Sequence, residues 1–415
     1  MDAALKPAPV KRKFFTPGVI VLSILVINGL IFAFFRIVFG IGSITNLNNQ
    51  YPWGIWIGID VAAGVALAAG GFTTAALAHI FHKDEYHAIV RPALLTAMLG
   101  YTFVGLGVCF DLGRYYFIYH VFYMWNGNSV LFEVGLCVMA YLTVLYIEFL
   151  PAVTERFLGR VNFKGIFSFL NKIIETILKH IDRFMNYALF FFIIAGVVLS
   201  CLHQSSLGTL MMIAGPKIHP LWQSPIAPLM YLISAISVGF PMVIMESLLA
   251  SRSFGLKPEM DVLTRLGRFV GPLLGVYLCF KLGDIVIRET FVYLTEFNFV
   301  TLMFGIEIIV GVIIPLRMFF SQKVLDSRTL IFIASSLVIF GVFLNRFNNF
   351  IIAYTPPYSF GTYFPSFGEI SVTIGFISLE ILLYRGLAML FPVISQHNKE
   401  YRPETKYAIL GGTGK

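Results

Sequence analysis

Long runs of apolar residues alternate with short polar segments along the whole chain. An α-helix rises about 1.5 Å per residue and the hydrocarbon core of a bilayer is about 30 Å thick, so about 20 apolar residues suffice to cross it. By this criterion the sequence predicts an all-α polytopic membrane protein with ten spans, at 18–39, 54–81, 90–115, 128–151, 184–204, 226–250, 268–290, 299–320, 328–347 and 367–392.

The composition supports a membrane protein. The nine apolar residue types make up 58% of the 415 residues, the charged types make up 13%, and there are 36 glycines in addition. Soluble domains are about 45–50% apolar with glycine included, and one core could not bury such an excess. The net charge of +8 would suggest nucleic acid for a soluble chain. Here the basic residues lie in short runs between apolar segments, which favours contact with an anionic lipid surface and no nucleic acid partner.

The distribution of Lys and Arg predicts the orientation of the chain. The N-terminus, the even-numbered loops and the C-terminus carry 24 of the 30 Lys and Arg residues, whereas the odd-numbered loops and the adjoining helix ends carry five. Because basic residues are retained on the cytoplasmic side, both tails, 1–17 and 393–415, are expected on the cytoplasmic side of a bacterial inner membrane. The first apolar run is too long for a cleavable signal, so we expect it to remain as a membrane anchor.

The predicted loops differ on the two sides. The outer loops are rich in Gly, Pro and aromatic residues, as in YPWG at 51–54, YHVFYMWNGN at 119–128 and TPPYSFGTYFP at 355–365. Trp and Tyr favour the headgroup layer, so part of this pattern is an aromatic belt. The long inner loop at 152–183 mixes apolar and basic residues. It predicts an amphipathic helix lying on the inner leaflet.

Cysteine and histidine give no sign of a metal centre. The four cysteines lie inside apolar runs without a C-x-x-C pair, so we expect no disulfide framework, iron–sulfur cluster or zinc site in this chain. A b-type haem needs two axial ligands at matching depth. Only His79 and His203 fall in or at the edge of a span, near opposite faces, and His120 falls in a loop. We therefore expect no haem, and any redox or catalytic domain must belong to another subunit.

Ionisable side chains inside a span cost at least about 2.5–3.5 kcal/mol, so each is a candidate functional residue. Five such groups are predicted to gather at similar depth in the outer half of spans 2 to 5: Asp60, Asp111, Arg114, Glu133 and His203. Asp111 and Arg114 lie one helical turn apart, so they could pair on one face of the helix. The cluster predicts a polar site inside a four-helix bundle. The structural alternative is a buried polar cluster that fixes helix packing.

Further titratable groups lead from this cluster toward the inner surface. Glu148 on span 4 and His79 on span 2 lie deeper. Glu133 and Glu148 are fifteen residues apart, about four helical turns, so they fall on similar faces of one helix. A proton path would need such a line of acids, but two unrelated acids at helix interfaces would give the same pattern.

The second half of the chain repeats this theme more sparsely. Glu246 lies on span 6, Lys281 and Asp284 on span 7, and Glu307 on span 8. Lys281 and Asp284 are spaced i, i+3 and could neutralise each other. For these second-bundle candidates the pattern favours a charge-paired packing core over a second functional site.

Several sequence strings resemble those of one known family. They are YPWGIWIGID (51–60), YHAIVRPALL (86–95), DLGRYY (111–116), NSVLFE (128–133), HQSSLGTLM (203–211) and KIHPLWQSP (217–225). With these strings in order over about residues 36–395, the chain is similar to the NrfD-like membrane subunits (polysulfide reductase NrfD/PsrC), and most closely to their HybB-like and QrcD-like branch.

The resemblance implies a haem-free protein with two four-helix bundles, here 54–204 and 226–347, flanked by the helices at 18–39 and 367–392. It implies electron exchange between the quinone pool, menaquinone or another quinone, and an extrinsic periplasmic subunit with several iron–sulfur clusters. Hydrogenase or multihaem cytochrome subunits would complete such a complex. The quinone is expected in the first bundle near the outer face, and the candidate quinone-binding residues on motif positions are Trp53, Asp60, Asp111, Arg114 and His203. Glu133 matches an acid that HybB-like members keep in their fourth span.

We therefore expect a quinone-reactive subunit of a respiratory oxidoreductase complex, not active alone. His203 or Asp60 would hydrogen-bond a quinone carbonyl, and Glu133, with Glu148 and His79, would relay protons. Protons taken from the inner side would make turnover move charge across the membrane. Two other functions fit the sequence less well: a passive anchor for redox subunits, and a secondary transporter, whose site would lie near the midplane.

Overall fold

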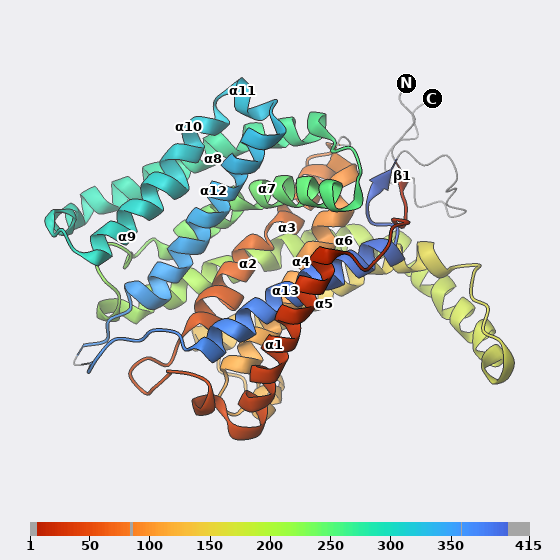
Figure 1. Ribbon diagram of the computed structural model, residues 1–415, viewed down its shortest axis with the longest axis horizontal. Coiled ribbons are helices and arrows are strands. Elements are labelled where there is room, and N and C mark those ends of the chain that lie inside the picture. The colour runs from red at the N-terminus through yellow and green to blue at the C-terminus, as the bar shows by residue number, and fades with distance from the viewer. Residues whose placement is uncertain (1–5, 84–85, 358, 397–415) are drawn as a thin grey trace.

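The computed structural model describes residues 6–83, 86–357 and 359–396. Within them, ten helices or chains of helical segments are long and apolar enough to cross a membrane, so the predicted fold class and number of spans are confirmed. Figure 1 shows these helices running roughly side by side. The spans are Pro17–Phe39, Trp56–Ile80, His87–Asp111, Val130–Phe157, Phe169–Lys217, Ala227–Phe254, Met260–Ile287, Phe299–Phe319, Arg328–Ile352 and Phe367–Leu390.

Several spans are built from more than one helical segment. The α-helices are α1 (Pro17–Phe39), α2 (Gly64–Leu67), α3 (Gly70–Ala75), α4 (His87–Asp111), α5 (Val130–Phe157), α6 (Phe169–Ala214), α7 (Ala227–Phe254), α8 (Met260–Ile287), α9 (Phe299–Ile308), α10 (Ile314–Phe319), α11 (Gln322–Leu325), α12 (Arg328–Phe347) and α13 (Phe367–Leu390). The π-helical segments are η2 (Trp56–Ala63), η3 (Ala76–Ile80), η9 (Ile309–Ile313) and η10 (Asn348–Ile352). The 3-10 segments are η1 (Ile41–Ser43), η5 (Tyr115–Phe122), η6 (Gly165–Ser168), η7 (Gly215–Lys217) and η8 (Thr290–Thr295).

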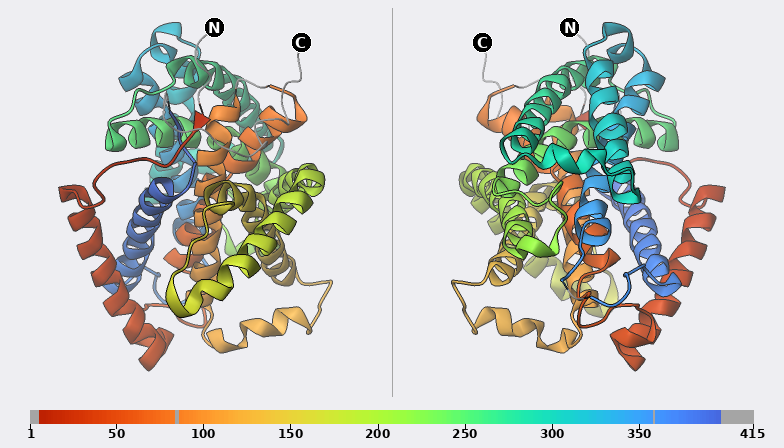
Figure 2. Two further views of the ribbon diagram at one scale, coloured as in Figure 1. Left: turned by 90° about the vertical axis from the view of Figure 1, so that its right-hand side faces the viewer. Right: turned by 90° about the vertical axis from the view of Figure 1, so that its left-hand side faces the viewer.

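The helices pack in two groups that contact each other. In the first group α3, α4, α5 and α6 touch in turn, and α6 also touches α3. In the second group α7, α8, α10 and α12 touch in turn, and α12 also touches α7. The groups meet through contacts of α7 with α2, α3 and α6. Helix α13 lies against α4 and η2, and α1 packs on α13 at the edge of the molecule (Figure 2).

Glycine permits the closest helix crossings. Gly311 of η9 faces Gly341 of α12, and a Cβ atom added to either residue would overlap the backbone of the other. Gly29 of α1 meets Gly375 of α13 in the same way, because an added Cβ would lie 2.8 Å from the opposing Cα. Small residues at such crossings let two backbones approach closely, which is how helices gain van der Waals contact in lipid.

The fifth span corrects the prediction for the inner loop. α6 is one helix of 46 residues, about 69 Å long, and its N-terminal part projects from the body of the protein (Figure 1). The second half of the 152–183 segment is therefore helical as predicted, but this helix is continuous with the fifth span and is not a surface helix of its own. No proline lies between Phe169 and Ala214 to interrupt the backbone ladder. Helix α6 also continues for eleven residues beyond His203, so His203 does not close the outer end of this span as predicted.

The two described tail segments lie together. Strand β1 (Lys6–Pro7) pairs antiparallel with β2 (Ser395–Gln396), and Ala8 N donates to Ile394 O at 3.0 Å. Both tails therefore lie on one side, as an even number of crossings requires. The rest of the predicted tails, residues 1–5 and 397–415 with His397, lies outside the described residues.

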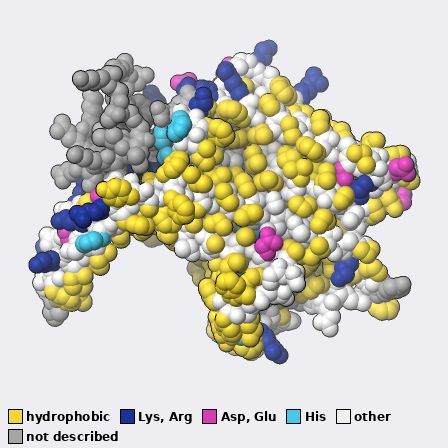
Figure 3. All heavy atoms as spheres, turned by 180° about the vertical axis from the view of Figure 1, so that it is seen from behind, with side chains coloured by type: hydrophobic (Ala, Val, Ile, Leu, Met, Phe, Trp, Pro, Cys, Tyr) yellow, Lys and Arg dark blue, Asp and Glu magenta, His cyan; other side chains and the backbone are white. Residues whose placement is uncertain are grey.

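The surface of the spans is suited to lipid. Large hydrophobic side chains such as Ile24 on α1, Phe191 on α6 and Leu302 on α9 are more than half exposed. Figure 3 shows one broad hydrophobic face, with Lys and Arg side chains mainly at its upper and left margins. Exposed apolar side chains on this scale are stable only in a non-aqueous environment.

Candidate functional site

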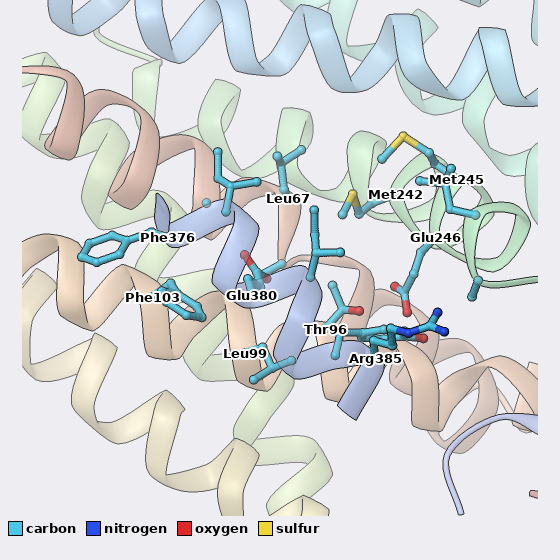
Figure 4. Close-up of a pocket in the computed structure, with 18 of the residues that line it drawn as sticks. Leu67, Thr96, Leu99, Phe103, Met242, Met245, Glu246, Phe376, Glu380 and Arg385 are labelled. Atoms are coloured by element: carbon cyan, nitrogen blue, oxygen red, sulfur yellow. The ribbon is translucent and has the colours of Figure 1, made fainter. Parts of the chain in front are cut away.

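A cavity of about 490 Å³ lies where the two helix groups meet α1 and α13. Its lining comes from η2, α2, α4, α7, α12, α13 and the N-terminal part of α1, and most of it is aliphatic or aromatic. Figure 4 shows the labelled part of this lining, with Phe103 and Phe376 toward one end and Glu246 and Arg385 toward the other. The cavity thus runs lengthwise between helices of both halves of the chain.

Asp60 is the predicted quinone-binding residue that lines this cavity. It lies in η2, a π-helical segment, and such wider turns are found frequently at functional sites. Its side chain is 9% exposed, and its Oδ2 accepts a hydrogen bond from Thr373 Oγ1 at 2.7 Å. Gly107 of α4 leaves room beside it, since an added Cβ there would lie 3.0 Å from the Asp60 Cβ. Asp60 of span 2 therefore faces α13 at the edge of the large apolar cavity.

His203 lies inside the first helix group. It is fully buried, and its Nδ1 lies 3.2 Å from the hydroxyl oxygen of Tyr101 on α4. Its Nε2 is buried without a hydrogen-bond partner among the described residues. The next residue, Gln204, donates from Nε2 to Val65 O at 2.8 Å. These contacts tie spans 2, 3 and 5 together, but His203 does not line the large cavity.

The residues of the predicted proton line have separate surroundings. Glu133 lies in the first turn of α5, is exposed, and accepts a hydrogen bond from Ser206 Oγ at 2.6 Å. The Glu148 carboxyl lies against Gly196 of α6. The His79 ring is 4.8 Å, centroid to centroid, from that of His87. In residues 6–83, 86–357 and 359–396, no hydrogen bond or ring contact joins Glu133, Glu148 and His79 to one another.

The predicted pair of Asp111 and Arg114 is wrong for the described part of the chain. α4 ends at Asp111, so Arg114 has left the helix and is exposed. Helical i, i+3 spacing therefore no longer brings the two side chains together. The nearby cation is Arg36 of α1, which is 1% exposed and donates from Nε to Phe110 O at 2.9 Å and from Nη2 to Leu112 O. Its guanidinium also lies 4.9 Å from the centroid of the Tyr115 ring.

Arg36 satisfies carbonyl groups at the C-terminus of α4, where the helix dipole favours a positive charge. We expect Arg36→Ala to destabilise the protein by about 2–3 kcal/mol, because it leaves two carbonyl acceptors without their charged donor. Arg114→Ala should shift the melting temperature far less, since Arg114 is exposed. Thermal unfolding of the two purified variants in detergent tests this, and equal shifts would contradict it.

The outer loops that precede spans 2 and 10 are joined. Tyr51 OH donates to Gly361 O at 3.0 Å, and Ile55 N donates to Tyr363 OH at 3.2 Å. Tyr363 OH in turn donates to Glu369 Oε1 at 2.5 Å. Burial and the adjacent Glu369 carboxyl raise the pKa of the Tyr363 phenol well above its ordinary value, so the phenol remains a donor.

Trp53, another predicted quinone-binding residue, packs in this outer region. Its ring lies 6.1 Å from the centroid of Phe350 and 5.8 Å from that of Tyr354. It therefore connects the loop before span 2 to the end of span 9 and does not line the large cavity.

The second group contains a dense polar network. Glu307 is 1% exposed, and its carboxylate accepts three hydrogen bonds, from Trp222 Nε1 at 2.8 Å, Asn345 Nδ2 at 2.7 Å and Asn348 Nδ2 at 2.7 Å. Asp284 forms an ion pair with Arg288 at 2.6 Å, and Lys281 Nζ donates to Leu221 O at 3.0 Å. Lys281 and Asp284 therefore form no direct ion pair in the described part of the chain, because Arg288, one turn further along α8, reaches Asp284 instead. Glu246, by contrast, lines the large cavity.

Three polar residues of the last span were missed in the sequence. Glu369 is fully buried, Thr373 bonds Asp60, and Glu380 lines the cavity. The rule that an ionisable residue inside a span is a functional candidate applies equally to Glu369 and Glu380, so it would have found both. Thr373 carries no such signal, and only the packing of α13 against η2 reveals it. Within the described residues, no group of three or more His, Cys, Asp or Glu side chains is arranged to hold a metal ion.

Comparison with known proteins identifies the family. Residues 43–356 match the family described as "Polysulphide reductase, NrfD". The chain belongs to the NrfD family. This confirms the resemblance carried by the sequence strings, and, together with the ten apolar helices, makes this NrfD protein an integral multi-pass membrane protein.

Curated relatives place the family in redox complexes. The chain is 32% identical to the "Probable Ni/Fe-hydrogenase 2 b-type cytochrome subunit" of Escherichia coli, over 95% of this chain and 97% of that protein. It is 28% identical to the "Menaquinone reductase, integral membrane subunit" of Nitratidesulfovibrio vulgaris, over 59% and 56%. It is 23% identical to a selenate reductase subunit of Mesobacillus selenatarsenatis, over 95% and 97%. The protein is thus a NrfD-type membrane subunit related to subunits of respiratory oxidoreductase complexes.

Proposed function

We propose that this NrfD protein exchanges electrons between an iron–sulfur partner subunit on the periplasmic side and the menaquinone pool. The observation that carries this proposal is the apolar cavity with Asp60 in its wall. A volume of about 490 Å³ lies within the range of small-molecule sites and is sufficient for a flat two-ring headgroup. The name of the Nitratidesulfovibrio relative supports menaquinone as the substrate.

Asp60 and Thr373 supply the polar contact that orients the headgroup. A quinone carbonyl accepts hydrogen bonds but donates none, so the protein must provide the donor. An ionised carboxylate is costly among apolar side chains, so a protonated Asp60 is the favoured form before the substrate is reduced. Reduction to the quinol takes up two electrons and two protons. Asp60 then passes its proton to the quinone oxygen as negative charge develops there.

The outer side of the protein is the proposed docking face for the electron-donating subunit. The Lys and Arg distribution supports an orientation with both tails in the cytoplasm of a bacterial cell and the aromatic outer loops in the periplasm. Asp60 lies four residues after the start of η2, about 6 Å along the span, so electrons from a cluster at the outer loops would have a short distance to travel.

In this proposal the other predicted residues have structural, docking or proton-transfer roles and do not contact the quinone headgroup. His203 holds spans 3 and 5 together behind η2, and Trp53 holds the loop that leads into η2. Arg114 and Asp111 lie at the outer ends of the first group, where a partner subunit would dock. Glu133, Glu148 and His79 form the alternative proton route suggested by the sequence.

A photoreactive menaquinone analogue tests the proposal on the purified complex. We expect the label in η2, α4 and α13, around Asp60, and its loss when excess menaquinone competes. Labelling confined to a partner subunit would contradict the proposal and leave this chain as a passive anchor. A competition experiment with an unrelated isoprenoid alcohol of the same tail length provides the control for binding through the tail alone.

A further inference from the structure

The inner part of the large cavity contains carboxyl groups that quinone binding does not use. Glu246 of α7 and Glu380 of α13 both line it, and in Figure 4 Glu246 is drawn near Thr96 and Arg385, in a lining that is otherwise mostly apolar. Glu380 makes no hydrogen bond or ion pair with any described residue, and its Oε1 lies close to Gly100 of α4. Two acids in such surroundings are costly unless they exchange protons or hold water.

The polar residues of α13 form a line along one face of this helix. Thr373, Glu380 and Tyr384 are separated by seven and four residues, which keeps them on the same side. Their rise along the helix is about 10 Å from Thr373 to Glu380 and about 6 Å more to Tyr384. Because Thr373 bonds Asp60, the line begins at the proposed quinone headgroup and leads toward the inner end of the cavity.

Glu246 continues this line on the opposite wall. Its buried carboxyl group lies beside the hydroxyl groups of Thr96 and Tyr384, which are close enough to act as its hydrogen-bond donors, although none of these four oxygen atoms has a partner with full hydrogen-bond geometry among the described residues. The four oxygen atoms therefore form a buried polar cluster with incomplete hydrogen bonding, which is uncommon in a folded protein. They would be satisfied by water molecules, which fit where a site is polar and has enough room.

A smaller cavity of about 50 Å³ adjoins this place and shares Ala250 and Tyr384 with the large cavity. Its lining includes Lys257 and Glu259 from the segment between α7 and α8, which the distribution of Lys and Arg predicts to lie on the inner side. Tyr384 and Ala250 therefore lie between the two cavities. Arg385, which also lines the large cavity, donates to Lys13 O at 2.7 Å and to Ser253 Oγ at 2.8 Å.

We propose that Glu246 and Glu380, with water in the cavity, conduct protons from the inner face to Asp60. Protons would enter past Glu259 and Tyr384, pass to Glu246 and then Glu380, and reach the quinone oxygen through Asp60. Each quinone reduced takes up two electrons from the outer side and two protons from the inner side, so each turnover moves two charges across the membrane. This inference rests on the proposed quinone site, and it replaces the route through Glu133, Glu148 and His79.

The charged residues that line the large cavity are Asp60, Glu246, Glu380 and Arg385, and those that line the smaller cavity are Lys257 and Glu259. Arg385 is engaged by backbone carbonyls and Ser253, and its guanidinium lies 5.1 Å from the Phe254 ring centroid. Its fixed positive charge near the inner exit favours proton transfer by neutral carboxylic acids over the passage of free cations.

The test uses the complete complex reconstituted in liposomes, with quinone reduction and membrane potential measured together. We expect Glu246→Gln and Glu380→Gln to slow quinone reduction by about 100-fold, with the partner's clusters still reducible and photolabelling around Asp60 unchanged. Glu380→Asp, which keeps a titratable group, should recover a large part of the rate. Asp326→Asn removes an exposed carboxyl from the loop before α12 and should behave as wild type.

Three outcomes would overturn the inference. Wild-type rate and potential in both glutamine variants would remove these acids from the route. If Glu133→Gln lost the membrane potential while Glu246→Gln and Glu380→Gln retained it, the proton route would instead run through the first helix group. Absence of photolabel around Asp60 in the wild type would overturn the proposed quinone site and this inference together. The first two results would leave the proposed quinone site standing.

Discussion

Replacement of Asp60 by asparagine should reduce quinone turnover of the purified complex by about 100-fold or more. Asparagine has nearly the same shape, and its amide oxygen can still accept the Thr373 hydrogen bond seen at 2.7 Å. It cannot release a proton at neutral pH. The variant therefore separates the acid–base role of Asp60 from its role in packing η2 against α13. Steady-state quinone reduction, with cluster reduction followed in the same sample, measures the effect.

Two companion variants sharpen this prediction. Thr373→Ser keeps the hydroxyl donor and should retain most of the turnover. Thr373→Val removes the donor at nearly constant volume and should give an intermediate loss, because Asp60 would lose the partner that orients it. Full quinone turnover in Asp60→Asn would contradict the proposed role of Asp60. The sample must have intact clusters and contain no unassembled partner subunit that reduces quinone by itself.

The largest effect on stability is expected for Gly311→Leu. Gly311 and Gly341 cross so closely that even one Cβ atom would overlap the opposing backbone. Neither backbone can move aside cheaply, since Glu307 on the same span holds Asn345 and Asn348 on the facing one. We expect a cost of about 3 kcal/mol or more and a large drop in the yield of folded protein, because overpacking forces helices apart.

Gly283→Leu is the matched control for this variant. Gly283 lies in α8 of the same helix group, and an added Cβ there would meet no atom within 4 Å. Yield in mild detergent and the apparent melting temperature should stay close to wild type for Gly283→Leu and fall for Gly311→Leu. Equal behaviour of the two variants would show that the glycine crossing is not needed for folding.

The membrane fold could be predicted because its main constraint acts locally. A span must be apolar over about 20 residues whatever it packs against, so all ten spans were visible as runs in the sequence. Helix ends were harder to predict. α6 continues for ten residues beyond 204 because nothing in its sequence stops it, and its extra length moves His203 away from the helix end.

Candidate residues could be found in the sequence, but their partners could not. Burial cost marks Asp60, Glu246 and Glu307 as unusual wherever they lie. The sequence assigned Arg114 to Asp111 and Lys281 to Asp284 by helical spacing. In the folded chain Arg36, from a distant helix, instead binds the backbone carbonyls of Phe110 and Leu112 beside Asp111, and Arg288, one turn further along α8, pairs with Asp284. Spacing describes one helix, whereas a buried charge pairs with whichever group tertiary packing brings close.

The sequence by itself determined the class of protein, the ten spans, the family and the residues too polar for lipid. The first, second and fourth of these depend on the free energy of transferring each side chain from water to lipid, and the family depends on the sequence motifs and their order along the chain. Only the tertiary structure decided that the apolar cavity lies between the two helix groups, with Asp60, Glu246 and Glu380 from three spans in its wall. A cavity is a property of how helices far apart in the chain fit together, and no single helix carries a pattern that specifies it.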